Sequence, residues 1–380
     1  MSDSDWTRLE SVIIKGLRQL RGRFLQRGRE GTWATQDISD HSTEMERSLL
    51  CTLPADMQLY ILSFLSPQDL CMLGMTNHYW HLMVRDRLLW RYFLLRDFPS
   101  WHSIEWHNLP DLSILKSCLS EPMEDKHPDY MATYVVVYLK GCPRNRRYMR
   151  TRHPIYGAVT SFLQSLVTLP EPRFAMFGAG LEQLDDSLVT RMMTSSELRP
   201  VISIIQRQVD GIGSGVTFQL DNQHKFNILT LYTKTRTERD RARVDPNVAE
   251  NKMFLPEAPG DSQQATSDNL IPQVKEVCKI VDGFIYVANA ESHANHNRSL
   301  EIAQIQAMTD QTFGSRKRPL LVLSCVTHVE RSRIPCVYVA HELGLNKLQR
   351  PWMVQDTEAV TLWGLLDGIE WILNEVGKKL

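Results

Sequence analysis

The stretch that decides the fold is PRFAMFGAGLEQLDDSLVTRMM, residues 172–193. Its opening, RFAMF, is a short apolar run typical of a buried strand. Gly178-Ala179-Gly180 follows, and the remaining residues, LEQLDDSLVTRMM, predict a helix. A strand, a glycine turn and a helix in direct succession have the outline of a loop that holds phosphate groups.

The sequence after this stretch alternates strands with helices. The expected elements, in chain order, are the strands GVTFQL and HKFNILTLYT, the helix IPQVKEVCKIV, the strand DGFIYVANA, the helix SLEIAQIQAMTD, the strand PLLVLSCV, the segments PCVYVAHELGL and PWMVQD, and the closing helix AVTLWGLLDGIEWILNEV. Near-continuous apolar strands between helices predict an α/β fold, with a mostly parallel sheet and helices on both faces. Only residues 221–223 separate the first two strands, so these are expected to form an antiparallel hairpin.

The residues at the glycine turn do not fit phosphate chemistry. A working phosphate loop reads G-x-x-x-x-G-K-[ST]; its backbone amides and lysine hold phosphates, and its hydroxyl holds magnesium. Aligned on Gly178, the second glycine falls at Gln183, the lysine at Leu184 and the hydroxyl at Asp185. Asp185 and Asp186 would repel a triphosphate, since like charges in partly shielded surroundings repel strongly at close range. The sequence therefore predicts the shape of the loop without a nucleotide cofactor.

Composition and charge narrow the classes of function. The 380 residues carry a formal net charge of -1 and predict two or three domains. This charge gives no reason to expect nucleic-acid binding, and no apolar run reaches the length of a membrane span. The seven cysteines are scattered without a Cys-x-x-Cys pair, which argues against a zinc module and favours reduced thiols. The expected location is cytoplasmic, with no metal site.

Residues 1–50 are expected to hold an amphipathic helix and a polar linker. The apolar positions recur at helical spacing, with basic residues between them: Trp6, Leu9, Val12, Ile13, Leu17, Leu20 and Phe24. A membrane-surface helix or a transit peptide is one interpretation. A packing or self-association helix, through which a homodimer would form, is the favoured one.

Residues 51–98 hold more apolar side chains than three short helices can bury. Pro54 and Asp56 open a first helix, and Ser66 followed by Pro67 predicts a capped start of a second. A third segment, residues 80–93, contains two tryptophans and several leucines. This surplus predicts a permanent apolar interface with another protein.

The order and spacing of these residues resemble an F-box, although an ordinary helical hairpin is the alternative. Leu53-Pro54, Ile61 to Leu65, Pro67-x-Asp69-Leu70, Trp80 and Leu89-Trp90 carry the resemblance. F-box motifs bind the Skp-type adaptor of cullin-RING ubiquitin ligases, so the resemblance implies a non-catalytic substrate-recognition subunit of such a ligase. It implies adaptor contacts by Leu53, Pro54, Ile61, Leu62, Leu65, Pro67, Leu70, Leu73 and Trp90.

From residue 166 to 380, the order of elements resembles the small-GTPase fold. The ending HELGLNKLQRPWMVQDTEAVTLWGLLDGIEWILNEV is similar to the last strand and helix of Arf-type GTPases. Two further nucleotide motifs of that family are missing. After HKFNILTLY the sequence gives TKTRT in place of Asp-x-x-Gly, and after PLLVLS it gives residues 325–328, CVTH, in place of Asn-Lys-x-Asp. The resemblance implies a pseudo-GTPase domain, and a divergent GTP-binding regulatory protein is the alternative.

Between these parts, residues 99–165 are expected to form a helical linker. Helices are expected at 109–119 and 129–139, followed by a basic run at 144–152 that either faces solvent or holds a phosphate.

Residues 166–380 are the expected substrate-binding domain. In the small-GTPase strand order, GVTFQL would lie at the sheet edge, where Val216, Phe218 and Leu220 are predicted to receive a strand of the substrate. A loop or a linker helix that covers this edge is the alternative. The resemblance also implies a telomeric repeat-binding factor, or a D-type cyclin, as the substrate.

Overall fold

The computed structural model describes residues 49–110, 129–141, 171–184, 187–204, 212–220, 224–233, 253–254, 269–294 and 296–377. The predicted N-terminal helix, the basic run at 144–152 and most of the predicted helix at 109–119 lie outside these residues. The chain forms two compact units. Unit 1 comprises Met1–Phe98 and Asp111–Val136, and unit 2 comprises Pro99–Pro110 and Val137–Leu380.

Unit 1 is helical in its described part. Its elements are α2 (Leu49–Thr52), α3 (Ala55–Leu62), α4 (Pro67–Gly74), α5 (His78–Met83), α6 (Arg87–Asp97), the start of the 3-10 turn η1 (Phe98–Ser100) and the first half of α8 (Tyr130–Gly141). Each of the three helices α4, α5 and α6 begins behind a side chain that accepts a backbone N–H: Ser66, Asn77 and Asp86. These caps satisfy N–H groups that the first helical turn leaves free, so they fix where the helices begin.

An aromatic cluster forms the centre of unit 1. The rings of Trp90, Phe93 and Tyr134 contact one another, and all three side chains are buried. The indole N–H of Trp90 donates to the Val84 carbonyl at 2.6 Å, and the Tyr134 hydroxyl donates to Asp97 at 2.6 Å. Because buried tryptophan and tyrosine need partners for their polar atoms, the first bond holds α6 against the end of α5 and the second holds α8 against the end of α6.

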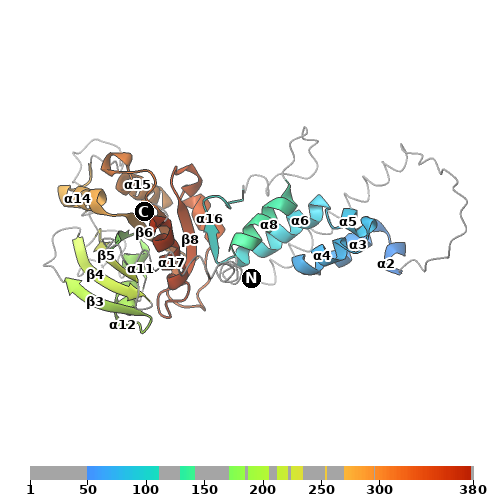
Figure 1. Ribbon diagram of the computed structural model, residues 1–380, viewed down its shortest axis with the longest axis horizontal. Coiled ribbons are helices and arrows are strands. Elements are labelled where there is room, and N and C mark those ends of the chain that lie inside the picture. The colour runs from blue at the N-terminus through green and yellow to red at the C-terminus, as the bar shows by residue number, and fades with distance from the viewer. Residues whose placement is uncertain are drawn as a thin grey trace, which may run out of the picture. The chain divides into compact units, whose positions relative to one another are not determined.

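Unit 2 is built on an eight-stranded sheet with the order β1-β8-β7-β6-β2-β5-β4-β3 (Figure 1). The strands are β1 (Ser103–Glu105), β2 (Arg173–Phe177), β3 (Leu198–Ile204), β4 (Ile212–Leu220), β5 (His224–Leu231), β6 (Gly283–Asn289), β7 (Leu320–Val326) and β8 (Trp352–Glu358). The strands β5, β2, β6, β7 and β8 are parallel, whereas β4, β3 and β1 pair antiparallel. The predicted α/β fold and the β4–β5 hairpin are confirmed.

Helices cover both faces of this sheet. The helices of unit 2 are α11 (Gly180–Gln183), α12 (Leu188–Thr194), α14 (Pro272–Ile280), α15 (Arg298–Met308), α16 (Cys336–Glu342) and α17 (Leu365–Gly377), with 3-10 turns η3 (Gln311–Phe313) and η4 (Leu345–Lys347). On β6, Ile285 and Val287 join the apolar core that includes α12 and α17. Tyr286, between them, bonds to Glu301 of α15. Since neighbouring strand residues point to opposite faces, α15 and α17 lie on opposite sides.

Three details differ from the sequence predictions. The single helix expected after the glycine turn is two short helices, because Leu184 turns into the core at 2% exposure and Ser187 caps α12. The strand β3 was missed because Pro200 interrupts it, and the pairing register shifts between Pro200 and Ile202. The region expected to be a helical linker begins with the strand β1 instead.

Candidate functional site

Large apolar side chains on unit 1 face solvent from three successive helices and their flanks. We call this set the α3–α5 surface; its residues are Leu53, Met57, Tyr60, Phe64, Met72, Met75, Tyr79 and Leu82. Phe64 is 70% exposed, Met72 65% and Met75 80%. Single exposed apolar residues are ordinary, but a concentration of this size on one small unit makes this surface the candidate site of a protein interaction.

A buried glutamine holds the beginning of α3 in position beside α5. The side-chain amide of Gln58 donates to the Leu53 carbonyl at 2.8 Å, and its oxygen accepts the Tyr79 hydroxyl. Gln58 is 1% exposed. Because a buried amide is costly without partners, these bonds fix both Leu53 and Tyr79 at the surface.

The residues predicted to contact an adaptor divide into surface and core. Leu53 and Pro54 are exposed, and Ile61, Leu65, Pro67 and Leu73 are half-buried. Leu62, Leu70 and Trp90 are at most 1% exposed, so they pack in the interior of unit 1. The prediction that these three side chains contact the adaptor directly is wrong for this structure. The sequence reasoning also missed Tyr60, Phe64, Met72, Met75, Tyr79 and Leu82, which are exposed. Their spacing along the helices was the available signal.

The glycine turn of unit 2 uses its backbone amides within the protein. The amides of Leu181, Glu182 and Gln183 donate to carbonyls of Gly178 and Ala179 at 3.0 to 3.1 Å. The amide of Ala179 bonds to the hydroxyl of Tyr286, which donates in turn to Glu301 at 2.8 Å. Burial, together with the Glu301 carboxylate, raises the pKa of Tyr286 well above its ordinary value. In a phosphate loop these amides would point at the ligand.

Side chains next to the turn are also engaged. The Glu182 carboxylate accepts the Thr233 amide and hydroxyl, both at 2.5 Å, at the end of β5. Gln183 accepts the side-chain amide of Asn289 at 3.1 Å. Leu184, at the lysine position of a phosphate loop, lies in the core. Asp185 and Asp186 lie outside the described residues. The turn therefore has an apolar side chain at the lysine position and the Glu182 carboxylate beside it, whereas a phosphate site needs positive charge.

Two loops at the same end of the parallel strands as the glycine turn, after β7 and β8, are tied together by a carboxylate. In the small-GTPase pattern the first of these loops, after β7, would hold the guanine base. Here Glu358 accepts the amide of Val329 at 2.7 Å and the hydroxyl of Thr361. The amide of Ala359 donates to the Val326 carbonyl at 2.9 Å. His328 is exposed on the first loop. The loops hold each other through this carboxylate and through a backbone bond.

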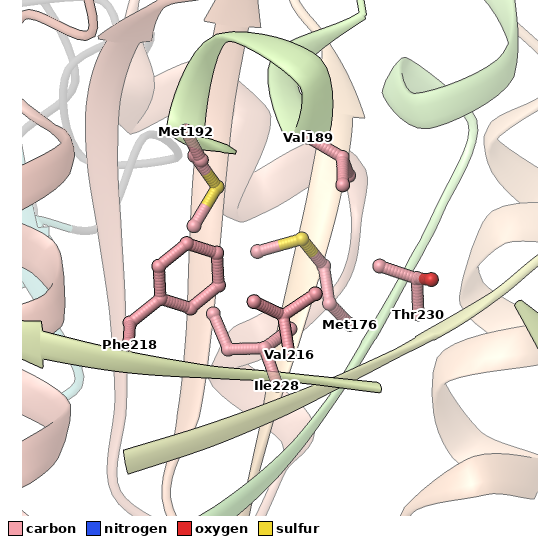
Figure 2. A pocket seen from close by; sticks show the side chains of 7 residues that line it. All are labelled: Met176, Val189, Met192, Val216, Phe218, Ile228 and Thr230. Atoms are coloured by element: carbon pink, nitrogen blue, oxygen red, sulfur yellow. The ribbon is translucent and has the colours of Figure 1, made fainter. Parts of the chain in front are cut away.

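The predicted substrate edge is wrong in its position. The strand β3 pairs with β4 along Leu198–Ile204, so β4 lies inside the sheet. Val216, Phe218 and Leu220 are at most 4% exposed. Figure 2 shows Val216 and Phe218 around a small apolar space whose other lining residues are Met176, Val189, Met192, Ile228 and Thr230. These β4 side chains face the core beneath α12 and cannot receive a partner there.

The described residues offer neither a metal centre nor a membrane-spanning helix. Among them, no group of three or more histidine, cysteine, aspartate or glutamate side chains is placed to hold a metal ion. No helix in the same part of the chain has the length and apolar character needed to cross a bilayer.

Comparison with known proteins agrees with the pattern in unit 1. The F-box-like domain family matches residues 50–96, which span α3 to α6. The chain is thus an F-box protein with an α/β second unit. It is 55% identical to human F-box only protein 4 over 376 residues, or 99% of this chain and 95% of the relative. The mouse relative of the same description is 54% identical with the same coverage. The chain belongs to the F-box only protein 4 family.

Two more distant matches were found. F-box/LRR-repeat protein 5 of Xenopus tropicalis is 31% identical over 87 residues, which cover 23% of this chain and 12% of the relative. Among solved structures, the Arl6 BBS3 small GTPase from Trypanosoma brucei with bound GppNp matches with a TM-score of 0.35 and 14% identity. That match covers 56% of this chain and all of the other. The strand order given above, and not this match, defines the fold.

Proposed function

We propose that this protein is the substrate-recognition subunit of a Skp–cullin–F-box ubiquitin ligase. The α3–α5 surface carries the proposal, because it exposes eight large apolar side chains on the unit that matches the F-box-like family. Such a surface suits a permanent partner, here the Skp-type adaptor, which would cover it in the complex. Unit 2 would hold the substrate, and other subunits would transfer ubiquitin.

Four of the seven cysteine thiols have side chains that the structure describes, and these four support a role without covalent catalysis. Ubiquitin transfer through a thioester needs a reactive thiolate. Burial raises the pKa of Cys278 and of Cys325 to about 12, and it raises the pKa of Cys336 well above its ordinary value. Burial also raises the pKa of Cys71, which is half-buried. All four thiols are therefore protonated at neutral pH and are poor nucleophiles.

The adaptor interface can be tested by one charge on the α3–α5 surface. Phe64→Asp should reduce adaptor affinity at least tenfold, since an aspartate would be buried without a partner in the complex. Val329→Asp is the matched control, because Val329 is 76% exposed and lies on unit 2. Binding is measured by calorimetry with purified adaptor. Equal affinity of Phe64→Asp and the control would refute the assignment.

For the substrate, the open edge of the sheet is the outer side of β3. It ends the strand order among the described residues, and Arg199, Pro200 and Val201 on it are exposed. We propose that a substrate strand pairs here, where main-chain bonds give affinity. The two candidates implied by the resemblance, a telomeric repeat-binding factor and a D-type cyclin, are the proteins to assay.

A lysine at this edge tests the docking site. Val201→Lys should weaken binding of whichever candidate substrate the unaltered chain binds, by severalfold, because an edge lysine opposes strand addition. Its affinity for the adaptor should stay unchanged. Val329→Lys is again the control on unit 2. If the Val201→Lys chain captures the candidate as tightly as the control does, the substrate docks elsewhere.

A further inference from the structure

The segment Trp101–Pro110 is built into the sheet of unit 2, although it follows α6 directly in sequence. We call this segment the strap. Its strand β1 pairs with β8 in the register Ser103 to Gln355, Ile104 to Val354 and Glu105 to Met353. Ser103 and Ile104 are at most 1% exposed. The strap closes the β8 edge, so part of unit 2 is supplied by residues next to the F-box.

Backbone bonds extend the pairing at both ends of β1. The amide of Asp356 donates to the His102 carbonyl at 2.8 Å, and the amide of Trp106 donates to the Trp352 carbonyl at 3.0 Å. The His102 ring lies 3.6 Å from the Asp356 carboxylate and packs edge-on against Trp363. A three-residue strand is short, and these contacts enlarge its attachment.

The helix α16 holds both ends of the strap. At the start of α16, the Cys336 thiol donates to the Trp101 carbonyl at 3.1 Å. Near its end, His341 Nε2 donates to the Pro110 carbonyl at 2.8 Å. Since α16 also contacts β1 and β8, this one helix packs the strap against the sheet and hydrogen-bonds to both of its ends.

The contacts of Cys336 and His341 with the strap, which we call the α16 clamp, lie close to two of the points where the chain passes from one unit to the other. The chain passes between the units after Phe98, after Pro110 and after Val136, and the first two of these points border the strap. Phe98 is 3% exposed in unit 1, and Ser103 is buried in unit 2. Only residues 99–102 lie between these two buried residues along the chain. A released strap would lengthen both connections.

We propose that the α16 clamp on the strap positions unit 2 for ubiquitin transfer by fixing the points where the chain joins it to the F-box unit. This rests on the function proposed above. Cys336 and His341 are then positioning residues: they touch neither adaptor nor substrate, but they set which lysines of unit 2 the ubiquitin-carrying enzyme reaches.

The clamp itself is tested by hydrogen exchange on the full chain bound to its adaptor. His341→Ala should speed exchange of the Trp106 amide at least tenfold, and Cys336→Ala should do the same for the Asp356 amide, because local opening becomes easier. Cys336→Ser keeps a donor and should restore slow exchange. His224→Ala, at an exposed strand end, is the matched control. Unchanged exchange in both alanine variants would overturn the clamp.

The positioning role is tested by mapping ubiquitin on the chain's own lysines in the reconstituted ligase. Lys275, Lys279, Lys317 and Lys347 of unit 2 serve as reporters. The double variant Cys336→Ala/His341→Ala should keep adaptor affinity within twofold and change the ratios among these lysines at least threefold. The same ratios as in His224→Ala would overturn the proposal. No transfer by the unaltered chain would overturn the proposed function, and the positioning role with it.

Discussion

Single residues on α3 show what the sequence could and could not predict at the surface. Leu62 was expected to contact a partner and is buried, whereas Phe64, two positions later, is exposed. Both sides of α3 and of the turn that follows it are apolar: Leu59 and Leu62 are buried, whereas Tyr60 and Phe64, which lies just past the end of α3, are exposed. Helical spacing tells which residues share a face. It cannot tell which of two apolar faces is turned inward, because contacts with the rest of unit 1 decide that.

A second residue, Glu291, predicts how stability depends on pH. It is almost buried and accepts the Thr327 amide at 3.0 Å, with His293 at 3.3 Å. Burial alone would raise the pKa of Glu291, but the Thr327 bonds and His293 outweigh it, so the pKa lies below its ordinary 4.5. The stabilisation is therefore complete above pH 4.5 and is lost as the pH falls through the folded-state pKa.

Glu291→Gln should lower the free energy of unfolding at pH 7, and the difference from the unaltered chain should shrink as the pH falls below 4.5. Urea unfolding at a series of pH values measures this. Glu330→Gln, an exposed carboxylate on the neighbouring loop, is the control and should show no such trend. A difference that is constant from pH 7 to acid would contradict the argument.

Among the elements, the regular strands were predictable and the interrupted ones were not. The strands β6 and β7 are buried at every position and read as near-continuous apolar runs. β3 contains Pro200 and a register shift, and β1 has only three residues that pair with a strand about 250 positions away. Local sequence carries no signal for such pairing. α11 and α12 separate because Leu184 packs inward, which is also a tertiary effect.

Helix starts, by contrast, are set locally and give a second prediction. Ser66 accepts the Asp69 amide at 3.1 Å and donates to its carboxylate at 2.6 Å, as the sequence suggested for the start of α4. Ser66→Ala should destabilise unit 1 by about 1 kcal/mol. Ser66→Thr keeps the hydroxyl and should stay close to the unaltered chain. Thermal unfolding of the full chain is the measurement, and equal melting of the two variants would show that the cap is dispensable.

At the scale of the whole molecule, the order of strands and helices in the sequence was enough to predict the architecture of unit 2. The absence of the nucleotide motifs was enough to predict a loop without a bound nucleotide. The missing lysine at Leu184 was visible in the sequence. The replacement contacts were not, because Tyr286 and Thr233 lie far from the glycine turn along the chain. Only the folded sheet brings the Tyr286 hydroxyl to the Ala179 amide and Glu182 to Thr233.

These contacts give the last prediction, made for the full chain bound to its adaptor. Adding GTP with magnesium should leave the melting temperature unchanged. A phosphate would have to displace Tyr286 from the Ala179 amide and would meet the Glu182 carboxylate beside it. A nucleotide present at 100 times its dissociation constant would add about 2.7 kcal/mol, which corresponds to a rise of several degrees in a domain of this size. Inorganic phosphate with magnesium is the control for general salt effects. A saturable rise that requires both GTP and magnesium would show that the internal contacts open for a ligand, and the GTP-binding alternative would then replace the pseudo-GTPase interpretation.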